Sequence, residues 1–154
     1  MKKKLLYFGI FLAVIGVLLV FDLARASLYD VEFVDIQSTP GIADGSTEDT
    51  LTVQVTRGGT PQAGHDLYII SRNGGKFAAN RVRSDEQGRA VFTYYPYLAT
   101  KTTPLTDVSL VVRDESNSIF LEVNAEGHTV LEMIESDTDN SMESEEIMSG
   151  IFGD

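Results

Sequence analysis

The sequence predicts an all-β antiparallel sandwich behind one apolar N-terminal segment. Short runs rich in β-branched and aromatic residues alternate with polar turn segments across residues 28–134. These turns, rich in Gly, Pro, Asn and Asp, recur about every 8–12 residues, as in a β-sandwich. One uncharged run precedes the domain at residues 5–21, and nothing after it in the domain has the periodicity of a helix.

The N-terminal segment is predicted to form a membrane helix. Lys2, Lys3 and Lys4 precede the 17 uncharged residues of 5–21, which approach the length needed to cross a hydrocarbon core. More positive charge before the run than after it favours an N-terminus inside the cytoplasmic membrane and a domain outside. We therefore expect residues 1–27 to act as a signal anchor that contacts the membrane through residues 5–21.

A secretory signal peptide is the alternative interpretation of the same segment. Ala24-Arg25-Ala26 is an A-x-A pattern whose cleavage would release a chain beginning at Ser27. The apolar run is longer than a usual signal core, and Asp22 and Arg25 are uncommon so near a cleavage site. Both interpretations place the domain outside the cytoplasm.

Alternation of apolar and polar residues predicts the main strands of the domain, residues 28–134. Leu51, Val53 and Val55 alternate with polar residues, which is typical of a strand buried on one face. Phe77 is expected to fill the core after the Asn73-Gly74-Gly75 turn. The other expected strands contain Val31 to Ile36, Gly64 to Ile70, Ala90 to Tyr94, Val108 to Val112, Ile119 to Val123 and Thr129 to Ile134, with turns at Asp114–Ser118 and Asn124–Gly127.

Five short motifs in a fixed order indicate which type of β-sandwich the domain is. They are ADG (43–45), LTVQV (51–55), PQAG (61–64), GGKF (74–77) and SDEQGRAVF (84–92). In this order the domain resembles the bacterial immunoglobulin-like domains of invasin and intimin. The resemblance implies an extracytoplasmic structural or adhesive module without catalytic residues. The chain departs from that family in having Ser84 where Thr is frequent, and one copy where tandem arrays are usual.

Charge and composition narrow the function classes. The net charge is −11, with +3 on residues 1–27, −7 on 28–132 and −7 on 133–154. An acidic chain does not suit nonspecific binding to nucleic acid. There is no cysteine, and His65 and His128 are the only histidines, so the sequence predicts no disulfide, no lipoprotein anchor and no histidine-rich metal cluster.

Candidate binding residues in the domain are basic or aromatic. The basic set could form a positive patch for an acidic polymer, a lipid headgroup or a protein segment, or could be solvated strand edges. Tyr95 and Tyr97 could form a contact surface or pack at a strand end, whereas Tyr94 should point inward. The basic set is Arg72, Lys76, Arg81, Arg83 and Arg89.

No cofactor or catalytic centre is expected. Asp44, Glu48 and Asp49 share one loop, but the D-x-D-x-D-G spacing of a calcium loop is missing. No G-x-S-x-G element accompanies the serines and histidines. We therefore expect a protein that is not an enzyme.

The C-terminal segment, residues 135–154, is acidic and is expected to be disordered when alone. Asn140 and Glu143 resemble a helix capping box, so the segment could fold on a partner. Its apolar residues are Ile147, Met148, Ile151 and Phe152. The alternatives are a docking peptide and a solubilising tail.

Together these features predict a membrane-anchored, noncatalytic binding or scaffolding subunit of a cell-surface assembly of the secretion, pilus or conjugation type. The alternative is a secreted adhesion or ligand-binding module released after Ala26.

Overall fold

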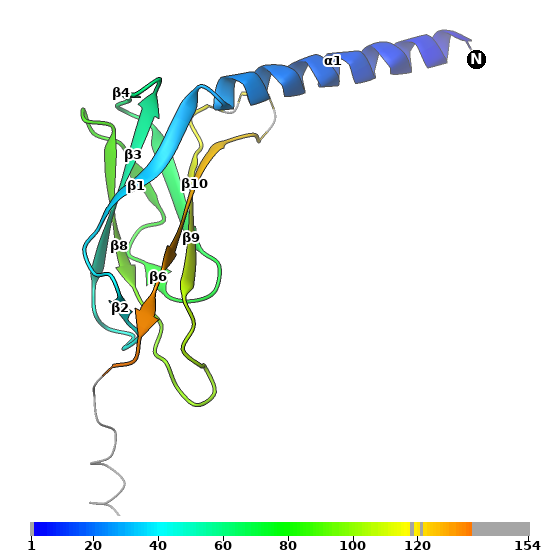
Figure 1. Cartoon of the computed structure of the whole chain (residues 1–154). Helices are drawn as coiled ribbons and strands as arrows, with labels where there is room; N and C mark the ends of the chain where they lie inside the picture. Colours follow the sequence, from blue (N-terminus) through cyan, green and yellow to red (C-terminus); the bar gives the residue numbers. More distant parts are fainter. Residues whose placement is uncertain (1, 118, 121, 137–154) are drawn as a thin grey trace, which may run out of the picture.

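The computed structural model describes residues 2–117, 119–120 and 122–136. A long helix, α1 (Lys2–Ala26), leads directly into a β-sandwich (Figure 1). The helix extends five residues past the uncharged run of 5–21 and therefore includes Asp22 and Arg25. Its stretch Leu6–Ala26 is long and apolar enough to cross a membrane, a property that signal sequences share.

Two antiparallel sheets face each other. The first has the strand order β1 (Tyr29–Ile36), β3 (Asp49–Arg57), β8 (Arg89–Tyr95) and β6 (Lys76–Phe77), with the short β4 (Thr60–Pro61) paired to β3. The second has the order β10 (Ala125–Leu131), β9 (Val108–Asp114), β5 (Asp66–Ser71) and β7 (Arg81–Arg83). The all-β prediction is confirmed.

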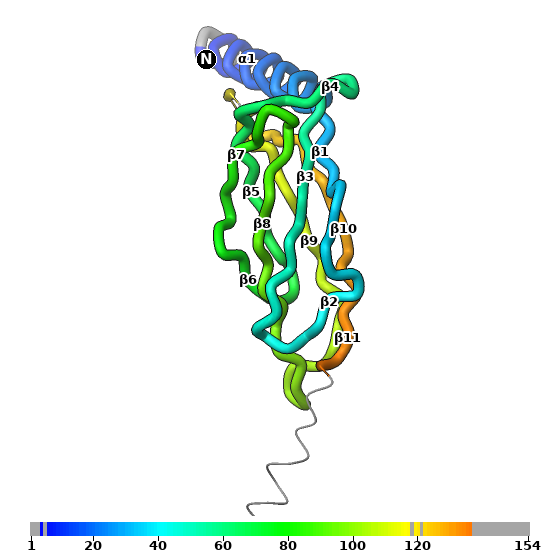
Figure 2. The backbone as a smooth tube through the Cα atoms, turned by 90° about the vertical axis from the view of Figure 1, so that its left-hand side faces the viewer, coloured from blue at the N-terminus to red at the C-terminus, as the bar shows by residue number. Residues whose placement is uncertain are grey.

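A small parallel pair closes the end of the sandwich away from α1. It joins β2 (Gly41–Ile42) to β11 (Met133–Ile134), as Figure 2 shows at the lower end of the tube. Residue 136, the last described residue, lies at this end, whereas α1 joins the sandwich at the other.

The core is built by the alternation that the sequence shows. Leu51, Val53 and Val55 of β3 are fully buried, while the threonines and glutamine between them lie on the outer face. Burial of each such aliphatic side chain stabilises the fold by about 1.5–3 kcal/mol. The facing side chains from the other sheet are Leu67, Ile69, Val108, Leu110 and Val112.

The expected strand through Ile119, Leu121 and Val123 is wrong. Ile119 and Phe120 lie in a connection, and Ser118 and Leu121 fall outside the described residues. The hairpin partner of β9 is instead β10, whose Ala125 pairs with Asp114. The expected turn at Asn124–Gly127 is therefore the start of a strand. The expected last strand is divided between β10 and β11.

The end of α1 is packed against this β9–β10 connection. The Phe120 amide donates a hydrogen bond to Asp22 Oδ2 at 2.9 Å. The rings of Phe21 and Phe120 meet edge to face, with centroids 5.9 Å apart. Asp22 and Ala26 are both buried. The helix is thus attached to the sandwich by side-chain contacts as well as by the chain.

Candidate partner-binding site

The five basic residues predicted to form a patch are distributed over two faces. Arg81 and Arg83 lie on β7 and Lys76 lies on β6, the edge strands on one side of the sandwich (Figure 2). Arg89 lies opposite Gln54, on the outer face of the β1–β3–β8–β6 sheet. Arg72 borders a shallow depression with Ser109, His128 and Val130 on the outer face of the second sheet.

Acidic neighbours neutralise part of the basic set. Arg81 Nε contacts Glu115 Oε2 at 2.9 Å, and this hydrogen bond with the Glu115 charge raises the pKa of Arg81. Arg83 Nε lies 3.6 Å from Asp66 Oδ1. Within the described residues, no ion pair joins Arg72, Lys76 or Arg89 to a carboxylate. The structure therefore disperses the five basic side chains over the edges and outer faces of the sandwich.

The two candidate tyrosines have different surroundings. The Tyr95 hydroxyl donates to Glu48 Oε1 at 2.9 Å, and this hydrogen bond raises the pKa of Tyr95. Lys76 Nζ lies over the same ring, 5.6 Å from its centroid. The Tyr97 hydroxyl donates to the Thr106 carbonyl at 2.8 Å and accepts from the Thr106 amide at 2.6 Å. Tyr97 therefore holds the β8–β9 connection in place and packs against the core, and both tyrosine side chains are half-buried.

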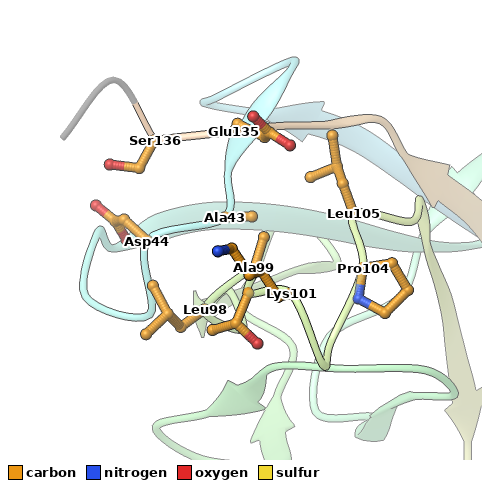
Figure 3. A pocket seen from close by; sticks show the side chains of 10 residues that line it. Ala43, Asp44, Leu98, Ala99, Lys101, Pro104, Leu105, Glu135 and Ser136 are labelled. Atoms are coloured by element: carbon orange, nitrogen blue, oxygen red, sulfur yellow. The ribbon is translucent and has the colours of Figure 1, made fainter. Parts of the chain in front are cut away.

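A hollow of about 690 Å³ lies at the end of the sandwich away from α1. Figure 3 shows Leu98, Ala99, Pro104 and Leu105 of the β8–β9 connection around it, with Ala43 and Asp44 from the segment after β2. Its remaining lining residues are Thr100, Lys101, Glu135 and Ser136. The sequence interpretation did not single out this hollow, because segments more than 90 residues apart in the chain build it.

Backbone hydrogen bonds hold the walls of this hollow. The Ala43 amide donates to the Ile134 carbonyl at 2.9 Å, and the Ala99 amide donates to the Ala43 carbonyl at 3.0 Å. Three segments thus lie side by side like strands. Exposed aliphatic side chains surround them, with Leu98 exposed by 56%. The other exposed residues are Ile42, Leu105 and Ile134. An apolar surface with charged side chains beside it suits a protein ligand.

Two carboxyl groups near the hollow have opposite environments. Partial burial opposes ionisation of Asp44, but hydrogen bonds from Thr47 and Ser46 outweigh it and lower the pKa of Asp44 to about 2. Asp49 is fully buried. Burial raises the pKa of Asp49, the nearby Ser38 hydroxyl offsets part of this rise, and the charge of Asp44 adds to it. Among the described residues, the Asp49 oxygens have no hydrogen-bond partner of good geometry.

The acidic loop does not assemble a metal site in the described part of the chain. No group of three or more His, Asp or Glu side chains there lies close enough to hold an ion. Asp49 points into the core near Gly41, away from the solvent. The Asp44 carboxylate accepts hydrogen bonds from Ser46 and Thr47 of its own loop.

One histidine–carboxylate pair has a structural role. His65 Nδ1 lies 2.8 Å from Asp114 Oδ2, and Asp114 also accepts hydrogen bonds from Asn117 and from the Ser116 amide. The Ser84 hydroxyl donates to the Gln62 carbonyl and accepts from the His65 backbone amide. That serine is therefore oriented by the backbone rather than by the imidazole, and the arrangement does not form a Ser–His–Asp relay.

The predicted tail residues Ile147, Met148, Ile151 and Phe152 lie outside the described residues.

The comparisons with known proteins concern the sandwich. No protein-family model and no curated protein matches the chain. Among solved structures, the D00-D0 domain of intimin has a TM-score of 0.50 at 17% identity, over 71% of this chain and 48% of that one. A 282-residue C-terminal intimin fragment, in complex with the intimin-binding domain of the translocated intimin receptor, has a TM-score of 0.46 at 20% identity, over 66% and 32%.

A conjugative transposon lipoprotein from Bacteroides eggerthii has a TM-score of 0.44 at 11% identity, over 68% of this chain and 96% of that one. The chain spans less than half the length of the intimin fragments it matches. The sandwich has the immunoglobulin-like fold. In particular, it has the fold of the bacterial immunoglobulin-like domains found in intimin, as the five motifs predict.

Proposed function

We propose that this protein is anchored by α1 in the cytoplasmic membrane, with its immunoglobulin-like domain outside as a noncatalytic binding or scaffolding subunit. The observation that carries this proposal is an apolar helix, exposed along nearly all its length, whose C-terminal end contacts an intimin-type sandwich. Exposed apolar side chains on such a helix need an apolar solvent, which a bilayer supplies.

Two observations support retention of the helix rather than cleavage. The A-x-A segment Ala24–Ala26 lies inside α1, and Ala26 is only 7% exposed. Asp22 lies under the β9–β10 connection and accepts the Phe120 amide. Cleavage after Ala26 would remove this contact. Three lysines, Lys2–Lys4, precede the uncharged run 5–21 and Arg25 is the only basic residue that follows it within α1, and this excess of positive charge supports the orientation with the N-terminus inside.

The partner of this subunit would be a protein of a surface assembly of the secretion, pilus or conjugation type. The hollow around Leu98 and Leu105 is the favoured contact region, because it combines exposed apolar side chains with a fixed backbone. Ser136 lines the same hollow, so the acidic segment 137–154 begins beside it. We propose that this segment docks on the same partner through Ile151 and Phe152.

Site-specific photocrosslinking in intact membranes tests the proposal. A photoreactive residue at Leu98 is compared with one at Val91, which is similarly exposed (54%) but lies on the outer face of the first sheet. We expect one defined protein adduct from Leu98 and none from Val91. Equal adduct patterns from both positions, with a chain that purifies alone and monomeric in gentle detergent, would contradict the subunit role.

Deletion of residues 137–154 separates docking from solubility. The deletion leaves Glu135, Ser136 and the hollow in place. Loss of the Leu98 adduct, with an unchanged circular dichroism spectrum, supports docking by the tail. An unchanged adduct together with lower solubility shows a solubilising role.

The second candidate function is a secreted adhesion or ligand-binding module. The A-x-A pattern at Ala24–Ala26 favours it, since cleavage there would release the sandwich from Ser27 onward. This candidate shares the export step and the domain with the first, and differs only in losing α1.

A further inference from the structure

The β9–β10 connection carries two large apolar side chains that are about half exposed. Ile119 is 52% exposed and Phe120 is 53% exposed. They lie beside the last turns of α1, where Phe21 is 50% exposed and Leu28, just after the helix, is 46% exposed. Apolar side chains that gather at one place on a surface mark a contact with another apolar phase.

The connection is attached to the helix through a buried carboxylate. The hydrogen bond from the Phe120 amide to Asp22 and the contact of the Phe120 and Phe21 rings hold the loop against α1. Asp22 is thereby covered, although it directly follows the uncharged run. A carboxylate exposed to lipid at this depth would be costly, and the loop removes that exposure.

The surroundings of this apolar surface match a membrane interface. A shallow groove next to it is lined by Phe21, Arg25, Leu28, Tyr29 and Arg57, among others. The Arg57 guanidinium lies over the Tyr29 ring, 5.5 Å from its centroid. Arg and Tyr side chains are favoured at the headgroup level, next to apolar side chains that enter the acyl region.

We propose that Ile119 and Phe120 insert into the interfacial region of the bilayer that α1 enters, so that the protein contacts the membrane through this loop as well as through α1. Their surface is continuous with that of α1, which selects lipid over a separate protein as the occupant. Two contacts would fix the orientation of the sandwich on the membrane and thereby direct its far end, with the hollow, toward a partner. This inference rests on the anchor proposed above.

Tryptophan fluorescence in liposomes tests the insertion. The chain has no tryptophan, so Phe120→Trp, Leu98→Trp and Phe11→Trp each give a full-length protein with one emitter. Each variant is reconstituted into phosphatidylcholine liposomes that carry bromine at defined acyl positions, which quench fluorescence at known depths. Phe11→Trp reports on the middle of α1, and Leu98→Trp reports on the far end of the sandwich.

We expect shallow bromines to quench Phe120→Trp several-fold more than Leu98→Trp, and deep bromines to quench Phe11→Trp most. Quenching of Phe11→Trp without extra quenching of Phe120→Trp would overturn the inserted loop and leave the anchor intact. Absence of quenching in Phe11→Trp would overturn both. The two proposals therefore fail in distinguishable ways.

A nitroxide label at position 119 tests the same insertion in a variant that keeps Phe120, in case the tryptophan variant does not fold. The chain has no cysteine, so Ile119→Cys can carry one nitroxide spin label, with Leu98→Cys as its control. We expect the label at 119 to be more accessible to oxygen and less accessible to a water-soluble nickel chelate than the label at 98. Equal accessibilities at the two positions would overturn the proposal.

Discussion

At the scale of single residues, the end of the sandwich away from α1 places two carboxyl groups under opposite electrostatic influences. Asp44 is ionised easily because Ser46 and Thr47 donate to it, whereas Asp49 resists ionisation because it is buried. The sequence showed both residues as members of one acidic loop. Alternation could have separated them, since Asp49 begins the strand that continues with Leu51 and Val53 on its inward face.

These environments predict opposite effects of two matched substitutions. The raised pKa of Asp49 contributes stability fully below pH 3.8, and this contribution is lost as the pH rises through the folded-state pKa. The lowered pKa of Asp44 contributes stability above pH 3.8 that is lost as the pH falls through about 2. At pH 7 we therefore expect Asp49→Asn to raise the free energy of unfolding and Asp44→Asn to lower it.

Urea unfolding of the full chain in detergent at pH 7 and pH 3 measures both effects. Both differences from the wild-type free energy should shrink at the lower pH. If Asp49→Asn instead lowers the free energy of unfolding by the same amount at both pH values, the native state needs that carboxylate.

A glycine in the β5–β6 turn gives a second prediction at this scale. Gly75 has φ +73°, and a Cβ there would overlap the ring and hydroxyl of Tyr94. Gly58 also has positive φ, at +55°, but a Cβ there would meet open space. We expect Gly75→Ala to lower the free energy of unfolding by about 2–4 kcal/mol and Gly58→Ala by about 1–2 kcal/mol. Equal losses, measured by denaturant unfolding, would show that Tyr94 moves aside without strain.

At the scale of elements, the sequence predicted β3, β8 and β9 because each alternates over at least five residues, and it predicted β5 from the apolar run that follows Gly64. It failed at Ile119–Val123, where the same alternation belongs to a connection. The pattern does not show what covers the apolar side chains. Ile119 is 52% exposed, and Phe120 is 53% exposed although it contacts the end of α1. The hollow could not be predicted either, since it depends on the meeting of β2, β11 and the β8–β9 connection.

The different burial of the two alternating segments gives a direct prediction. Leu110 is fully buried in β9, whereas Ile119 is 52% exposed in the connection. Leu110→Ala should lower the free energy of unfolding by about 2–5 kcal/mol, because it leaves a cavity. Ile119→Ser should change that free energy in detergent by no more than about 0.5 kcal/mol. A loss from Ile119→Ser as large as that from Leu110→Ala would restore the strand interpretation.

At the scale of the whole molecule, the chain combines an exposed apolar helix, an intimin-type sandwich and an acidic C-terminal segment. The hollow is lined in part by the segment after β2, and β2 and α1 lie at opposite ends of the sandwich (Figure 1). This separation suits a subunit that is attached at one end and binds a partner at the other. The sequence predicted the helix and the fold, since both depend on local patterns. It could not place Asp22, whose burial depends on a loop almost 100 residues later.

Retention of α1 is the claim on which this account depends most. Membrane and soluble fractions of cells that make the native protein are separated, and the intact mass of the chain is measured in each. We expect the full-length chain, with α1, in the membrane fraction. A soluble chain that begins at Ser27 would contradict the anchor and would make the secreted module the better interpretation.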